Sequence, residues 1–322
     1  MSTISEFSPA WWLSNRHLQT VFPSLLRKRL TVPLTSERLE LPDGDFIDLE
    51  WAQHNHGPLV IVLHGLEGNL QSHYACGLLK ALETSGFNVA FMYSRGCSGE
   101  PNRLARRYHA GETGDIHHVL NVLFEREPNR PIAAVGISLG GNTLLKYLGE
   151  QGGNTQIKAA VAVSVPFDLS ISASTLEHGF ARYYQRHLVD KLKTAITEKH
   201  RAVSLPFPLP DLDQIHTLRQ FDDRITAPLH GFNGVDDYYT QSSCRQYLKD
   251  IRIPTLILHA KDDPFMTPAA IPGKDELSGS IDLHLTEHGG HVGFIHGNLP
   301  IKPHYWLEES IPAWLKQGLK VM

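Results

Sequence analysis

Residues 136–141, Gly-Ile-Ser-Leu-Gly-Gly, have the residue types and spacing of a serine nucleophile. In a G-x-S-x-G turn between a strand and a helix, the serine hydroxyl stands above the sheet, and the flanking glycines leave room for the sharp bend. An apolar run at 132–135 precedes the motif and predicts a buried strand, and apolar residues at helical spacing follow it at 144–148. We therefore predict a nucleophile elbow with Ser138 as the nucleophile.

A serine hydroxyl needs a neighbouring base, and the base needs an acid that orients it. Where this motif occurs, the chain order is serine, then aspartate or glutamate, then histidine. The apolar run at 255–258 is followed by Asp262, Asp263 and Pro264. Because a proline favours an extended backbone at the preceding residue, we predict Asp263 as the acid, with Asp262 as the alternative.

The base should follow a later strand. The run at 281–285 is followed by His288, two glycines and His291. The glycines allow the loop to bend back over the sheet, so we predict His291 as the base. His288 is the alternative, and His109, close to a glycine-containing segment, is a weaker candidate.

An oxyanion formed at the substrate carbonyl needs two hydrogen-bond donors. The backbone N–H of Leu139, directly after the nucleophile, is the first predicted donor. The second should come from residues 64–69, His-Gly-Leu-Glu-Gly-Asn, which follow the apolar run at 59–63. We assign this donor to the N–H of Leu66.

Residues 93–99, Tyr-Ser-Arg-Gly-Cys-Ser-Gly, follow another apolar run. Cys97 is a possible nucleophile by residue type, but no strand-to-helix elbow surrounds it. We interpret the segment Arg95-Gly96-Cys97-Ser98-Gly99 as a loop packed beside the site.

The elements that position these residues alternate along the chain. Apolar runs predict strands at 46–51, 59–63, 87–93, 131–137, 159–165, 255–258 and 281–285. Helical spacing of apolar residues predicts helices at 76–82, 116–124, 144–148 and 307–319. Alternating strands and helices indicate an α/β fold, with a mostly parallel central sheet and helices on both faces.

The alternation stops between residues 167 and 250, where polar and aromatic residues increase and a helical pattern covers 183–197. We predict a mostly helical cap insertion there, between an N-terminal arm and first core part (1–35 and 36–166) and a second core part (251–322). Apolar and aromatic residues of this segment, such as Phe167, Phe180, Tyr183 and Tyr184, are candidates to line the substrate pocket, although residues of these types more often pack in the core.

Composition narrows the class of protein. The chain has 322 residues, 41% of them hydrophobic, and a net charge of −4 from 30 basic and 34 acidic residues. These values exclude a disordered chain and give no basic excess for nucleic-acid binding. Three widely spaced cysteines do not indicate a disulfide framework.

No apolar run approaches 18 residues, and the apolar stretch at 10–13 is too short for a signal peptide. We therefore expect a cytoplasmic protein without stable membrane insertion. The chain has 19 histidines, but no H-E-x-x-H or C-x-x-C motif accompanies them. We expect neither a metal ion nor an organic cofactor.

These segments together resemble the α/β-hydrolase superfamily, and more narrowly AB-hydrolase family 4. That family includes bacterial hydrolases of unknown substrate, fungal medium-chain ethanol acyltransferases and animal phospholipase-like members. The resemblance covers nearly the whole chain. It rests on residues 16–20 (RHLQT), 64–68 (HGLEG), 95–99 (RGCSG), 136–142 (GISLGGN), 236–239 (DDYY), 262–265 (DDPF) and 288–291 (HGGH).

The resemblance implies an α/β-hydrolase fold with Asp263 as the acid and His291 as the base. The expected activity is hydrolysis of a small-molecule carboxylic ester with a short- to medium-chain acyl group, through an acyl-enzyme. Two alternatives remain open. One is acyl transfer to an alcohol or thiol, and the other is a binding protein that keeps the scaffold without the catalysis.

Overall fold

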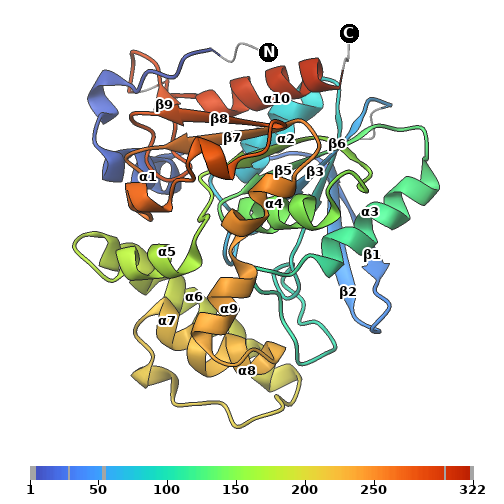
Figure 1. Ribbon diagram of the computed structural model, residues 1–322, viewed down its shortest axis with the longest axis vertical. Helices are drawn as coiled ribbons and strands as arrows, with labels where there is room; N and C mark the ends of the chain where they lie inside the picture. The colour runs from blue at the N-terminus through green and yellow to red at the C-terminus, as the bar shows by residue number, and fades with distance from the viewer. Residues whose placement is uncertain (1–4, 28–29, 53–55, 301, 320–322) are drawn as a thin grey trace.

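The centre of the molecule is an eight-stranded sheet (Figure 1). The structure is a computed structural model, and it describes residues 5–27, 30–52, 56–300 and 302–319. The strand order of the sheet is β1-β2-β4-β3-β5-β6-β7-β8. The strands are β1 (Leu34–Glu40), β2 (Phe46–Ala52), β3 (Leu59–Leu63), β4 (Asn88–Met92), β5 (Ile132–Ile137), β6 (Ile157–Val163), β7 (Thr255–Ala260) and β8 (Ile281–Thr286).

In the order of the sheet, the neighbouring strands from β4 through β3 to β8 pair in parallel. Strand β2 pairs antiparallel with both β1 and β4. Every residue of β3, β4 and β5 is buried, because helices cover both faces of a parallel sheet. The predicted mostly parallel α/β sheet is confirmed.

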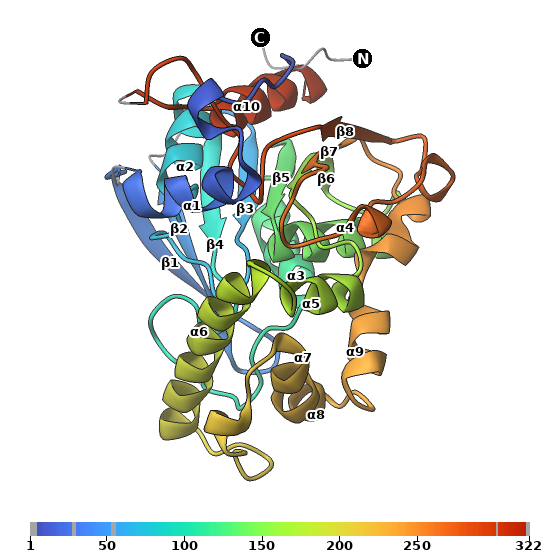
Figure 2. The same cartoon turned by 90° about the vertical axis from the view of Figure 1, so that its left-hand side faces the viewer.

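Two pairs of helices enclose the sheet (Figures 1 and 2). Helices α2 (Ala75–Thr84) and α10 (Trp306–Gly318) pack on one face and share one apolar cluster with the sheet. Helices α3 (Gly114–Arg126) and α4 (Leu139–Gln151) pack on the other face over a second cluster. The core therefore consists of two apolar layers separated by the sheet.

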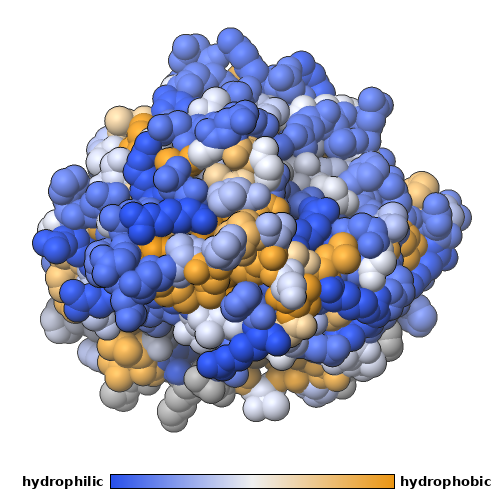
Figure 3. Space-filling view, turned by 90° about the horizontal axis from the view of Figure 1, so that it is seen from below, coloured by the Kyte–Doolittle hydropathy of each residue, from blue (hydrophilic) through white to orange (hydrophobic). Residues whose placement is uncertain are grey.

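Five helices gather at one end of the molecule, beyond the end of the sheet (Figure 1). They are α5 (Leu169–Leu176), α6 (Ala181–Ala202), α7 (Leu218–Phe221), α8 (Ala227–His230) and α9 (Val235–Ser242). Residues of α6 pack on Phe221 and Ile225 to form a separate apolar cluster. Seen from this end, an apolar band crosses a largely hydrophilic face (Figure 3).

Several elements of the structure were not among the predicted ones. Strand β1 lies at the edge of the sheet, and only one of its residues is buried. Helix α1 (Arg16–Leu26) lies in the N-terminal arm, and β9 (Ile295–His296) pairs with β10 (His304–Tyr305) in a short antiparallel hairpin. An edge strand with alternating charges lacks the apolar run by which the other strands are recognised.

Candidate active site

Ser138 lies in the turn between β5 and α4, with φ 52° and ψ −118°. A Cβ at Gly136 would come within 2.5 Å of the Gly140 carbonyl oxygen, and a Cβ at Gly140 within 2.5 Å of the His64 carbonyl oxygen. Only glycine allows these close backbone approaches. The turn therefore has the elbow geometry that the motif predicts.

Ser138, His291 and Asp263 come together from three separate loops. Nε2 of His291 is 3.0 Å from Oγ of Ser138, and Nδ1 of His291 is 2.8 Å from a carboxylate oxygen of Asp263. The carboxylate accepts from Nδ1–H, which leaves Nε2 free to accept from the serine hydroxyl. Asp263 is 1% exposed, and a backbone N–H from Phe265 also donates to it.

The two alternative residues pair with each other. Asp262 lies 3.3 Å from Nδ1 of His288 and accepts from the backbone N–H of Gly290 at 2.9 Å. The bond to Gly290 fixes the loop that carries His291. His288 is half exposed, and the histidine bonded to Ser138 is His291.

Two groups that were not predicted hold the His291 side chain and backbone. The Phe265 ring stacks on the imidazole with a centroid distance of 3.9 Å and an interplanar angle of 4°. The backbone N–H of His291 donates to Oγ1 of Thr20 in helix α1. Both residues belong to segments noted in the sequence, 262–265 and 16–20, but neither residue type by itself indicates these contacts.

Residues 64–68 lie directly against the serine, since a Cβ at Gly65 would be 3.2 Å from Cβ of Ser138. The N–H groups of Gly65 and Glu67 donate to the hydroxyls of Tyr74 and Tyr108. Among the described residues, the N–H of Leu66 between them has no acceptor.

The N–H of Leu139, at the first position of α4, likewise has no acceptor among the described residues. Such unbonded donors at a helix start attract negative charge. The two N–H groups that the sequence singles out are therefore available to a ligand.

His64 holds residues 64–68 in place as an uncharged imidazole. Its Nε2 accepts from the Ser94 N–H at 3.0 Å, so Nδ1 carries the proton and donates to the Gly65 carbonyl at 2.7 Å. Burial lowers the pKa of His64, which keeps the ring neutral. The imidazole therefore links the loop after β3 to the loop after β4.

The loop after β4 is anchored by a buried cation. Arg95 is 3% exposed and makes a two-pronged ion pair with Asp115, while also bonding Asp43 and Asp45. The Cys97 thiol is buried, and burial raises its pKa well above the usual value. A thiol that stays protonated is a poor nucleophile, so the geometry supports a packing role for this loop.

A narrow cavity of about 30 Å³ lies beside Leu66 and Leu139, between the sheet and the five-helix group. Its apolar wall includes Leu192, Ile196 and Leu229. The cavity is therefore lined by the two residues that carry the free N–H groups, and also by residues of the cap helices.

The aromatic residues predicted to line a pocket are not among the residues that line this cavity. Phe167 is fully buried in the core over His259, and Tyr184 packs on Phe265. Phe180 and Tyr183 are more than half exposed. Residue type alone does not reveal which face of a helix turns toward a cavity, and the cap has several faces.

Titratable groups line the cap side of the same cavity. The rings of His109 and His230 lie 4.6 Å apart, and burial lowers the pKa of each to about 3. The Asp222 carboxyl accepts from the hydroxyls of Thr226 and Tyr239, and burial raises its pKa to about 6. At neutral pH both imidazoles are uncharged.

The sequence matches the family model described as "alpha/beta hydrolase fold" over residues 58–297. This match covers most of the chain and includes the segments that carry Ser138, Asp263 and His291. The chain therefore belongs to the α/β-hydrolase fold family.

Several curated proteins are similar along most of their length. The chain is 47% identical over 325 residues to "Putative esterase YheT" of Escherichia coli (strain K12), covering 99% of this chain and 95% of that protein. It is 30% identical to "Phospholipase ABHD3" of Mus musculus, covering 97% and 79%. It is 31% identical to "Monoacylglycerol lipase" of Saccharomyces cerevisiae, covering 80% and 59%.

Solved structures share the fold at low sequence identity. An esterase of Pyrococcus furiosus, Pf2001, superposes with a TM-score of 0.58 at 16% identity, covering 89% of this chain and 93% of that one. A 2,6-dihydroxy-pseudo-oxynicotine hydrolase gives 0.59 at 17% identity, covering 94% and 72%. No helix in the described parts of the chain is both long and apolar enough to cross a membrane.

Proposed function

We propose that this protein is a serine hydrolase of carboxylic esters with short- to medium-chain acyl groups. The observation that carries the proposal is the continuous hydrogen-bonded line from Ser138 through His291 to Asp263. The relatives named as esterase, phospholipase and monoacylglycerol lipase support the same reaction class.

In the first half of the reaction, Nε2 of His291 takes the hydroxyl proton as Oγ of Ser138 attacks the ester carbonyl carbon. Asp263 holds the ring in the required tautomer and stabilises the imidazolium that forms. The imidazolium then gives its proton to the departing alkoxide, and an acyl-enzyme remains on Ser138.

The carbonyl oxygen becomes negatively charged during the attack. The N–H groups of Leu66 and Leu139 have no other acceptor in the described structure, so both can donate to this oxygen. Each such donor is worth about 10²–10³ in turnover. In the second half, water gives its proton to His291 and attacks the acyl carbon, and the proton returns to Ser138 as the acid leaves.

The helical segment 167–250 acts as the cap over this centre. The cavity next to Leu66 and Leu139 has an apolar wall from α6 and α8, which suits an acyl chain. A cavity of about 30 Å³ has room for only a few water molecules, so a longer acyl group requires the cap side chains to move.

Labelling with a fluorophosphonate, followed by intact mass and peptide mapping, tests the nucleophile. We expect one adduct per chain on Ser138 in the wild type and none in Ser138→Ala. The variant Ser98→Ala, in the loop after β4, should label like the wild type. An adduct on another residue, or none on folded protein, would overturn the assignment of Ser138.

A second experiment measures the hydrolysis of p-nitrophenyl esters of increasing acyl length. Release of free acid from short and medium chains, absent in Ser138→Ala, is the expected result. Exclusive formation of a new ester when ethanol is added would instead identify the protein as an acyltransferase.

A further inference from the structure

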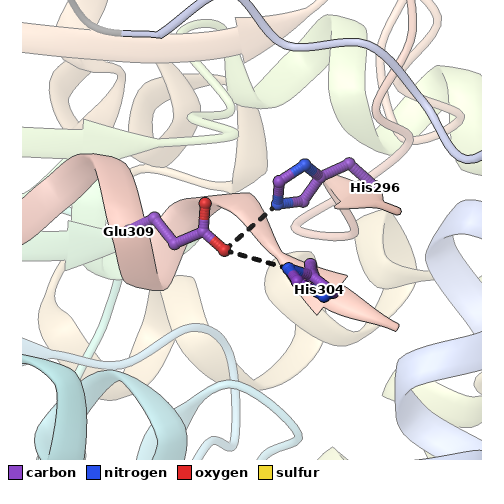
Figure 4. Close-up of side chains that lie close together, drawn as sticks. All are labelled: His296, His304 and Glu309. Atoms are coloured by element: carbon purple, nitrogen blue, oxygen red, sulfur yellow. Dashed lines mark hydrogen bonds and ion pairs between the residues drawn. The ribbon is translucent and has the colours of Figure 1, made fainter. Parts of the chain in front are cut away.

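Two imidazoles and a carboxylate meet on the surface, apart from Ser138 and its partners (Figure 4). They come from His296 in β9, His304 in β10 and Glu309 in the first turn of α10. We propose that these three side chains bind a divalent transition-metal ion of the Zn²⁺ type.

The distances between the ligand atoms suit such an ion. Nε2 of His296 lies 3.2 Å, and Nδ1 of His304 lies 3.5 Å, from the same carboxylate oxygen of Glu309. All three atoms lie within 4.8 Å of one another. Zinc bonds of about 2.0–2.1 Å in a tetrahedral arrangement place two ligands about 3.3 Å apart. Only small side-chain rotations are therefore needed to enclose an ion.

The backbone sets the two imidazoles side by side. His296 and His304 are register partners in the β9–β10 hairpin, and their rings lie 5.3 Å apart. Gly297 follows His296 with φ +101°, and a Cβ there would be 3.2 Å from the His304 ring. The glycine therefore makes both the turn and the space that the His304 ring occupies.

The ligand types select the class of metal. Imidazole nitrogens suit zinc, nickel and copper, whereas magnesium and calcium prefer oxygen ligands throughout. The side chains of His296, His304 and Glu309 are 27%, 48% and 52% exposed, so an ion has access from solvent. Three protein ligands also leave a fourth position for water.

A bound ion would connect the segment after His291 to α10. Gln19 of helix α1 bonds both the N–H and the carbonyl of Ile295, next to His296. The neighbouring Thr20 accepts from the His291 backbone. Because an ion that binds only the folded state stabilises that state, Zn²⁺ should raise the unfolding temperature.

Equilibrium dialysis of the full-length protein against Zn²⁺, with elemental analysis, measures binding directly. The variants are His304→Gln, Glu309→Gln and the control His200→Gln, which alters an exposed histidine at the end of α6. The wild type and His200→Gln should bind one Zn²⁺ more per chain than the two site variants. Even second-sphere changes weaken metal binding about 10–100-fold, so losing a ligand should weaken it by at least about tenfold.

Thermal unfolding gives a second measurement that does not depend on counting ions. Zn²⁺ should raise the unfolding temperature of the wild type and His200→Gln by several degrees, and Mg²⁺ should not. Circular dichroism establishes that the surface variants fold. Equal Zn²⁺ binding and equal stabilisation in the wild type, His304→Gln and Glu309→Gln would overturn the proposed site and assign any bound zinc to other histidines.

Discussion

Asp262 and Asp263 are adjacent in the chain, yet their carboxylates bond different groups in the loop that carries His291. Asp263 bonds the ring of His291, and Asp262 bonds the backbone of Gly290 directly before it. One carboxylate is therefore suited to support proton transfer, while the other holds the loop in place.

Replacing each aspartate by asparagine separates the two roles. We expect Asp263→Asn to reduce kcat by about 10⁴, because an amide at this position favours the wrong histidine tautomer. Asp262→Asn should reduce kcat by less than about tenfold, since the amide oxygen still accepts from Gly290. Steady-state hydrolysis of a p-nitrophenyl ester measures both, and equal losses would contradict the proposed roles.

At the scale of single residues, the positions of Ser138, Asp263 and His291 relative to one another could be predicted, but the contacts that hold His291 could not. The motif places Ser138 on a turn, and chain order indicates an aspartate and a histidine after later strands. The contacts of Phe265 and Thr20 with His291 join segments far apart in the chain. The metal ligands likewise lie on a hairpin and a helix whose spacing matches no common metal motif.

Among the elements, the loop after β4 depends on a buried charge. Arg95 contacts three carboxylates, of which Asp45 is fully buried and also accepts from the side chain of Asn102. The network joins the loop to the β1–β2 turn and to α3. It therefore fixes the position of the loop after β4, in which the backbone N–H of Ser94 donates to His64.

Removing this cation leaves buried carboxylates without their partner. Arg95→Met should lower the free energy of unfolding by about 3–5 kcal/mol. Arg252→Met removes the same side-chain type from an exposed pair with Asp250 and should change stability by at most about 1 kcal/mol. Urea unfolding followed by circular dichroism compares the two, and similar losses would show that the buried network adds little.

The cap helix α8 should set acyl length through Leu229, which lines the cavity. Leu229→Ala opens space and should shift the preferred ester toward longer acyl chains, by about fourfold in kcat/KM per methylene newly accommodated. Leu229→Trp should shift the preference toward shorter chains. The p-nitrophenyl ester series measures both, with a change of the exposed Leu25 in helix α1, Leu25→Ala, as the control. An unchanged profile in both variants would exclude this cavity as the acyl site.

How well a strand could be predicted depends on whether a run of apolar residues marks it in the sequence. Strands β3, β5 and β7 are buried throughout and appear as continuous apolar runs. The edge strand β1 and the two-residue strands β9 and β10 have no such run. The cap helices could be recognised as helical, but their packing arises from contacts between segments that the local pattern does not contain.

For the whole molecule, Asp222 makes folding stability depend on pH. Its pKa is raised from 3.8 to about 6 by burial, so the folded protein holds this proton after the unfolded chain has lost it. Where the folded state binds more protons, stability falls as pH rises. The contribution of Asp222 is therefore a loss of stability between about pH 4 and pH 6 that persists at higher pH.

Asp222→Asn removes this proton equilibrium. Relative to the wild type, the variant should gain on the order of 2–3 kcal/mol of unfolding free energy between pH 3.5 and pH 7. Urea unfolding at several pH values measures the difference, and Asp213→Asn provides an exposed control. A difference that does not change with pH would mean that the Asp222 carboxyl ionises as it does in water.

At Ser138, the proposed catalytic role and the stability of the fold favour different residues. A non-glycine residue in its left-handed conformation costs about 1–3 kcal/mol. Ser138→Gly should therefore need more urea to unfold than Ser138→Ala, which keeps the strained turn, and both variants should be inactive. Selection for fold stability alone would thus replace Ser138, so we expect a serine in this turn only where the proposed catalysis is also selected.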